Sequence, residues 1–140
     1  MKKSQRIAQK IGAKVEGSLD PHYLGYFDCF NRGEFYEAHD VLEQLWLKDR
    51  HGPNGAFYKG LIQLAGAFVH LRKERLRPAA ALFKLSTTYL GRYSGTHENL
   101  HMPAVLALIQ HWLGCLEKSE FSANPLHTEP SPVLRLIANV

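Results

Sequence analysis

The sequence predicts an all-α protein of about five helices, in an up-and-down bundle or in stacked helical hairpins, followed by an extended C-terminal arm. Two observations lead to this fold class. Apolar residues recur at helical spacing in five segments, and glycine, proline and asparagine cluster between those segments. No segment shows the alternating pattern that predicts a strand. The connections are short, so consecutive helices should be antiparallel neighbours.

The first two helices have clear boundaries. Asp20 and Pro21 predict the start of the first helix, with aspartate as the N-cap and proline at the first helical position. The glycine of residues 31–33 supplies a tight turn between helices. The second helix should run from about residue 34 to residue 49, before the glycine- and proline-rich loop 51–55.

Three further helices follow the loop. One should cover about residues 56–73, the next should open at Pro78 and run towards Gly91, and the last should open near Pro103. Prolines at both helix starts fit the first turn, where a missing backbone N–H costs nothing.

The C-terminal segment from Ser119 holds three prolines and cannot form a long helix. We expect an extended arm whose apolar end, residues 133–137, lies on this domain or on a partner subunit. The sequence thus divides into a basic N-terminal arm (1–18), a helical domain (19–118) and an extended proline-containing tail (119–140).

Composition limits the function classes. A chain of 140 residues makes one domain, and 45% hydrophobic with 21% charged residues is ordinary for a globular protein. No apolar run approaches the roughly 20 residues of a membrane span. The basic start lacks the apolar core of a secretion signal, so we expect a cytoplasmic protein with no membrane partner. The net charge of +4 is mild and forms no basic stripe with aromatic residues, which argues against nucleic-acid binding.

The two cysteines lie far apart in the chain. Cys29 and Cys115 both fall inside apolar helical patterns. We therefore predict reduced core residues, rather than a disulfide or a metal-binding pair.

A polar cluster on the second and third helices is the best candidate site. His39 and Glu43 are one turn apart, at the edge of the apolar stripe that carries Trp46. Gln63 and His70 share one line on the next helix, two turns apart. If the two helices form a hairpin, the four polar side chains should converge.

Glycines accompany this line on the third helix. Gly60 and Gly66 each cost about 1 kcal/mol relative to alanine inside a helix, so they need a structural or functional reason. Small residues here either let another helix approach closely or leave room for a ligand.

The cluster has the chemistry of a metal or acid–base site. His39, Glu43 and His70 could bind a divalent metal (zinc, iron or manganese) with an open place for a reactive water. Without a metal, His39 and Glu43 form a general acid–base couple. Gln63 would orient a substrate beside Trp46, whose indole N–H also lies within reach of Glu43. Alternatively, the same groups hydrogen-bond to each other and only fix the packing of the helix pair.

These residues carry a resemblance to a known family. Residues 30–46, FNRGEFYEAHDVLEQLW, contain the pattern H-x-x-x-E-x-x-W, and Gly-Leu-Ile-Gln follows at 60–63 with His70 beyond it. The segment of about residues 22–90 resembles the family called domain of unknown function 309, which is recognised by this pattern.

The resemblance implies a small helical protein from a family found in bacteria and archaea. Members of the family are often labelled predicted metal-dependent hydrolases, so the resemblance also implies that reaction class. The family usually has glutamate where this chain has Asp40, a position on the solvated side of the second helix.

A second histidine motif is set aside. His97 to His101 spell H-E-x-x-H, which binds zinc in metalloproteases when both histidines lie on a regular helix. Pro103 would clash with the carbonyl of Asn99, and it pushes Met102 out of helical geometry. We predict a loop that leads into the last helix.

The sequence is consistent with two main functions. The chain is either a metal-dependent hydrolase, or a non-catalytic helical interaction module that forms a homodimer or binds a protein partner. A basic-armed nucleic-acid accessory protein is a third and weaker hypothesis.

Overall fold

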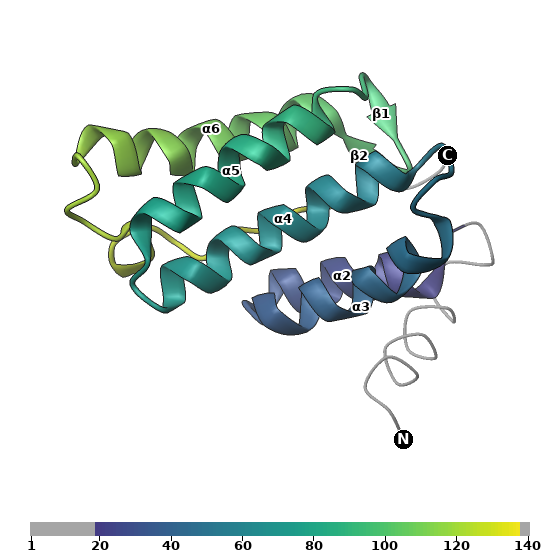
Figure 1. Cartoon of the computed structure of the whole chain (residues 1–140), viewed down its shortest axis with the longest axis horizontal. Coiled ribbons are helices and arrows are strands. Elements are labelled where there is room, and N and C mark those ends of the chain that lie inside the picture. The colour runs from purple at the N-terminus through teal and green to yellow at the C-terminus, as the bar shows by residue number, and fades with distance from the viewer. Residues whose placement is uncertain (1–18, 138–140) are drawn as a thin grey trace.

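Five α-helices run back and forth through residues 19–137, the part of the chain that this computed structural model describes (Figure 1). The elements are α2 (Pro21–Asn31), α3 (Phe35–Asp49), α4 (Gly55–Arg72), α5 (Leu76–Leu90), β1 (Thr96–His97), β2 (Leu100–His101), α6 (Met102–Lys118) and the short 3₁₀ helix η1 (Pro125–His127). The predicted all-α class is confirmed. The predicted basic arm, residues 1–18, lies outside the described residues.

The long helices pack in the order that short connections predict. Helix α4 lies between α3 and α5, while α2 packs on α3 and α6 packs on α5 (Figure 1). Consecutive helices are antiparallel neighbours, as in an up-and-down bundle.

One aromatic residue joins four of the helices around the core. The ring of Phe68 on α4 contacts Phe30 of α2 and Phe35 of α3, with centroids 5.6 and 4.9 Å apart. On its other side it contacts Phe83 of α5 and Trp112 of α6, at 5.2 and 4.9 Å. Edge-to-face and offset-stacked rings at these distances stabilise beyond the area that they bury. The helical domain therefore has a single core.

Local signals mark both ends of α2. The Asp20 carboxylate accepts a hydrogen bond from the backbone N–H of His22 at 2.7 Å, which makes it the predicted N-cap of α2. Gly33, with φ of +77°, makes the turn into α3. The predicted start of the fourth helix at Pro78 is wrong by two residues, because α5 begins at Leu76. Proline is accommodated at the third position, since the first-turn N–H groups have no helical partner.

A short β-hairpin occupies the H-E-x-x-H segment, where no strand was expected. Thr96 pairs with His101 and His97 pairs with Leu100, across a turn in which Glu98 and Asn99 have positive φ. The prediction that this segment is not helical is confirmed. The two histidines lie on opposite strands and do not form the one-turn pair of a zinc protease.

The tail returns along the bundle and packs on this domain as far as residue 137 (Figure 1). The Asn31 side chain donates to the backbone carbonyl of Leu134 and accepts from its N–H, both at 2.7 Å. Leu134 is buried, and Leu136 bridges to Leu100 of β2. Nearer its start, Asn124 donates to the carbonyl of Leu71 at 2.6 Å. Of the two placements expected for the tail, the one on its own domain is observed.

Within residues 19–137, no helix combines the length and the apolar character that crossing a membrane requires.

Candidate functional site

His39 and Glu43 lie on α3 at the edge of the exposed surface. The His39 side chain is 32% exposed, and its Nδ1 lies 3.2 Å from an Asp40 carboxylate oxygen. The ring also stacks on Tyr36, with centroids 6.4 Å apart. Among the described residues, no hydrogen bond or ion pair joins His39 to Glu43. The predicted acid–base couple is therefore two neighbouring surface groups in this conformation.

Trp46 lies partly buried where α3 meets α4. Its ring packs against the core, and the Lys59 ammonium lies 4.4 Å from the ring centroid. A cation over an indole face is attracted by the ring quadrupole. Within the described part of the chain, the indole makes no hydrogen bond with Glu43. These contacts connect α3 to α4 at the end of the motif.

Gln63 and His70 lie on the partly exposed stripe of α4. In each residue one polar atom, Gln63 Oε1 and His70 Nδ1, is buried and has no partner. The pKa of His70 is lowered from its ordinary value, first by burial and then by the positive charges of Arg75 and Lys73. His70 is therefore held neutral, the form in which imidazole accepts a hydrogen bond or a metal.

The four predicted residues do not close into a single group. Phe35 stacks on Phe68, and Trp46 lies beside Lys59, so α3 and α4 are antiparallel with the start of α3 beside the end of α4. This pairing leaves His70 more than a turn beyond the level of His39, about 7 Å along the axis. Among residues 19–137, the metal-ligating atoms of His39, Glu43 and His70 do not lie together as a three-ligand group. Metal binding by these residues stays a prediction.

The helix glycines belong to the interface between α4 and α5. A Cβ added at Gly60 would lie 2.6 Å from Cγ of Leu90, and one added at Gly66 would lie 3.2 Å from Leu82. The Ser86 hydroxyl donates to the Gly60 carbonyl at 2.7 Å. Of the two expected reasons for these glycines, close approach of a neighbouring helix is the one observed.

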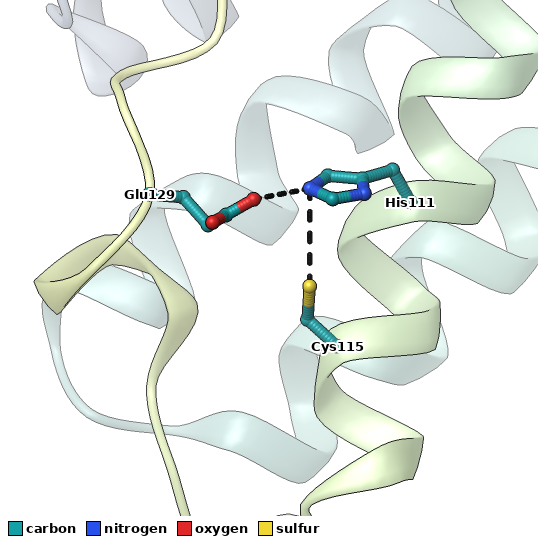
Figure 2. Close-up of side chains that lie close together, drawn as sticks. All are labelled: His111, Cys115 and Glu129. Atoms are coloured by element: carbon teal, nitrogen blue, oxygen red, sulfur yellow. Dashed lines mark hydrogen bonds and ion pairs between the residues drawn. The ribbon is translucent and has the colours of Figure 1, made fainter.

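A second cluster, on α6 and the tail, escaped the sequence analysis. Figure 2 shows His111 and Cys115 on one face of α6, with Glu129 of the tail facing them. Nε2 of His111 is hydrogen-bonded to the Glu129 carboxylate and lies 3.9 Å from Sγ of Cys115. Within residues 19–137, this is the group of histidine, cysteine and carboxylate side chains whose geometry could hold a metal ion.

The position of Cys115 corrects one prediction. Cys29 is buried in the core, but Cys115 is partly exposed. It lies on the side of α6 that faces Glu129, whereas the buried side carries Trp112 and Leu116. The prediction relied on the apolar residues around Cys115 in the sequence. Positions 111 and 115, however, lie one turn apart on the less apolar face of the helix.

Two cavities border this second cluster. The larger, of about 470 Å³, is lined by Glu74, Leu76, Cys115, Ser122, Ala123, Asn124, Pro125, His127, Thr128 and Glu129. The smaller, of about 270 Å³, is lined by Gln110, His111, Gly114, Cys115 and Lys118. Glu74 and His127 form an ion pair at 3.0 Å on the larger one. The hydrogen bond from His127, aided by Asn124, lowers the pKa of the Glu74 carboxyl.

Comparison with known families identifies the segment that carries the H-x-x-x-E-x-x-W pattern. Residues 23–82 match the family model described as domain of unknown function (DUF309). This match supports the resemblance of the segment to the DUF309 family. No curated protein and no solved structure matches the chain.

Only the first of the two clusters lies inside the DUF309 segment. It contains His39, Glu43 and the other residues predicted from the motif, on α3 and α4. His111, Cys115 and Glu129 all lie beyond its end at residue 82. The second cluster is therefore a feature of this chain outside the matched DUF309 segment.

Proposed function

We propose that the chain is a non-catalytic helical interaction module that forms a homodimer through one face of α3. This α3 face consists of Tyr36, His39, Glu43 and Leu47. The observation that carries the proposal is that Tyr36 and Leu47 are 59% and 56% exposed and lie about three turns apart on one line. The two polar residues of the motif lie between them.

Exposed apolar side chains mark a contact surface when they share one patch. Within residues 19–137, the large apolar side chains with high exposure are Tyr36, Leu47, Leu85, Val133 and Ile137. Tyr36 and Leu47 lie on one stripe of α3, and the partly buried Trp46 precedes Leu47 in the chain. Burying a leucine or an aromatic side chain contributes roughly 1.5–3 kcal/mol, so each of the two residues supplies an apolar contact at one end of the α3 face.

A second copy of the chain fits this face because the face is self-complementary. Two α3 helices that cross antiparallel about a two-fold axis set Tyr36 against Leu47 of the partner subunit, and the reverse. The same arrangement brings His39 within about a turn of Glu43 of the partner subunit. An imidazole and a carboxylate that make no bond to each other within one chain would then pair across the interface.

The competing function is a metal-dependent hydrolase at His39, Glu43 and His70. One observation favours it, since Gln63 and His70 each keep a buried polar atom without a partner on the adjoining helix. Buried polar atoms in native proteins usually have partners, and a bound ligand would supply one. This function requires movement of α4 side chains towards α3 before three ligands meet.

Sedimentation velocity over micromolar concentrations tests the proposal. We expect the unaltered protein to be a dimer, and Leu47→Asp to be a monomer that still unfolds cooperatively, because Leu47 is exposed in the single chain. The midpoint of this variant should fall only by the part that association contributes. Val133→Asp is the matched control: Val133 is 43% exposed but lies on the tail, so this variant should remain dimeric. A monomeric unaltered protein, or equal dissociation of both variants, would refute the proposal.

A further inference from the structure

We propose that His111, Cys115 and Glu129 form a binding site for a divalent metal of the zinc type, which fastens the tail to α6. The site is separate from the α3 face, and the proposal does not depend on dimer formation. All three side chains lie outside the DUF309 segment.

The His111 and Cys115 ligand atoms have nearly the spacing of two ligands on a tetrahedral ion, and the Glu129 carboxylate would move away from His111 Nε2 to admit the ion between them. One ligand atom of each residue lies within 4.8 Å of the other two, and His111 Nε2 is 3.9 Å from Cys115 Sγ. Zinc–sulfur and zinc–nitrogen bonds of about 2.3 and 2.0 Å place the two ligand atoms about 3.5 Å apart at a tetrahedral angle. A side-chain adjustment of a few tenths of an ångström therefore brings the pair into ligand geometry.

The helix fixes two of the three ligands. His111 and Cys115 are four residues apart on α6, and side chains at this spacing are neighbours on one helix face. Glu129 approaches from the tail just beyond η1, and its carboxylate already contacts His111 Nε2 (Figure 2). Since two ligands come from a rigid helix, most of the ordering is complete before an ion binds.

The donor set selects the class of ion. One imidazole nitrogen, one thiolate and one carboxylate oxygen form a mixed soft and borderline set, which suits zinc, cobalt or nickel. Calcium and magnesium prefer oxygen ligands alone, so a site with sulfur and nitrogen discriminates against them. Cys115 is partly exposed and bears no disulfide, so its sulfur is accessible to an ion from solution.

The neighbouring cavities leave room for a fourth ligand. Cys115 borders both the 470 Å³ and the 270 Å³ cavity, and Glu129 borders the larger one. Three protein ligands with an open fourth place are the arrangement in which zinc keeps a water or another small ligand. Glu74 and His127 also line the larger cavity.

Metal binding at this site should stabilise the folded chain. Helix α6 supplies two ligands and the tail supplies the third, so the ion closes the chain between Cys115 and Glu129. An ion that binds the folded chain and not the unfolded one raises the thermal unfolding midpoint. Coordination requires the thiolate form of Cys115, so binding also releases a proton and weakens as the pH falls.

Titration of the full chain with zinc and with cobalt tests the inference. We expect one zinc per chain by calorimetry, and a thiolate-to-metal charge-transfer band with cobalt. Cys115→Ser should abolish the band and weaken zinc binding more than the roughly 10–100-fold typical of an outer-shell change. Glu129→Gln is a second variant that alters a surface residue, and it should weaken zinc binding while keeping the cobalt–thiolate band.

His127→Ala is the matched control. It removes a histidine from the same cavity, but that histidine pairs with Glu74 and is not one of the three ligands. Its zinc affinity and its zinc-dependent rise in unfolding midpoint should equal those of the unaltered protein, whereas Cys115→Ser should show no such rise. Absence of zinc binding, binding that survives Cys115→Ser, or a cobalt complex without the thiolate band would overturn the assignment.

Discussion

His70 lies near the end of α4 with its Nδ1 buried and without a partner. Burial and the charges of Arg75 and Lys73 both lower the pKa of its imidazole. The buried hydroxyl of Tyr26, by contrast, donates to the carbonyl of Leu61 at 2.6 Å. A buried polar atom without a partner costs about 1–3 kcal/mol, so His70 is a weak point of the helix pair.

This residue makes stability depend on pH. Above the ordinary pKa of about 6.5, both the folded and the unfolded chain hold a neutral imidazole, and His70 adds no pH dependence. As the pH falls through that value, the unfolded chain takes up a proton that the folded chain resists, so the free energy of unfolding decreases. His70→Gln should flatten this slope in urea denaturation between about pH 7.5 and 5. An NMR titration that puts the pKa of His70 at or above its ordinary value would contradict the explanation.

Two helix glycines, Gly60 and Gly114, differ in the space that a side chain would have. Gly60 faces the fully buried Leu90, which leaves no space for a Cβ, whereas Gly114 on α6 has nothing within 4 Å of the corresponding position. The two glycines therefore test close packing against helix propensity, which favours alanine at both positions.

Alanine should have opposite effects at these two sites. Gly60→Ala should lower the free energy of unfolding by about 1–3 kcal/mol, because overpacking displaces Leu90 or the backbone of α5. Gly114→Ala should raise it by about 0.5–1 kcal/mol, because the exposed helix gains propensity without a clash. Urea denaturation of the two variants measures both values. Equal stabilisation of both would show that α4 and α5 are not in close contact at Gly60.

Elements with local signals could be predicted, and elements that depend on distant contacts could not. Asp20 and the spacing of apolar residues determine the helices, so the place of His39 and Glu43 at the edge of the apolar stripe followed from the sequence. Their expected convergence with Gln63 and His70 depended on how two helices align, which no local pattern encodes. The strands at 96–101 are only two residues each, too short for a periodic pattern. Glu129 meets α6 only because the tail turns back after η1, a path that no local pattern encodes.

At the scale of the whole molecule, the tail and the DUF309 segment lie in one domain. Asn31 of α2 binds the backbone of Leu134, and Leu134 completes the core. The histidines of the two clusters nevertheless have different surroundings. His39 lies on an exposed face of α3, and His111 faces a cysteine and a carboxylate beside a cavity. These surroundings favour contact between chains at the first cluster and metal binding at the second.

Zinc content of three purified proteins, measured by elemental analysis after equilibration with zinc and removal of the excess, tests this assignment most directly. We expect one zinc per chain in the unaltered protein and in His39→Ala, and loss of zinc in His111→Ala. Both histidines lie on the surface, so both variants should fold. Retention of zinc in His111→Ala with loss in His39→Ala would contradict the account and would identify the H-x-x-x-E-x-x-W motif as the metal site.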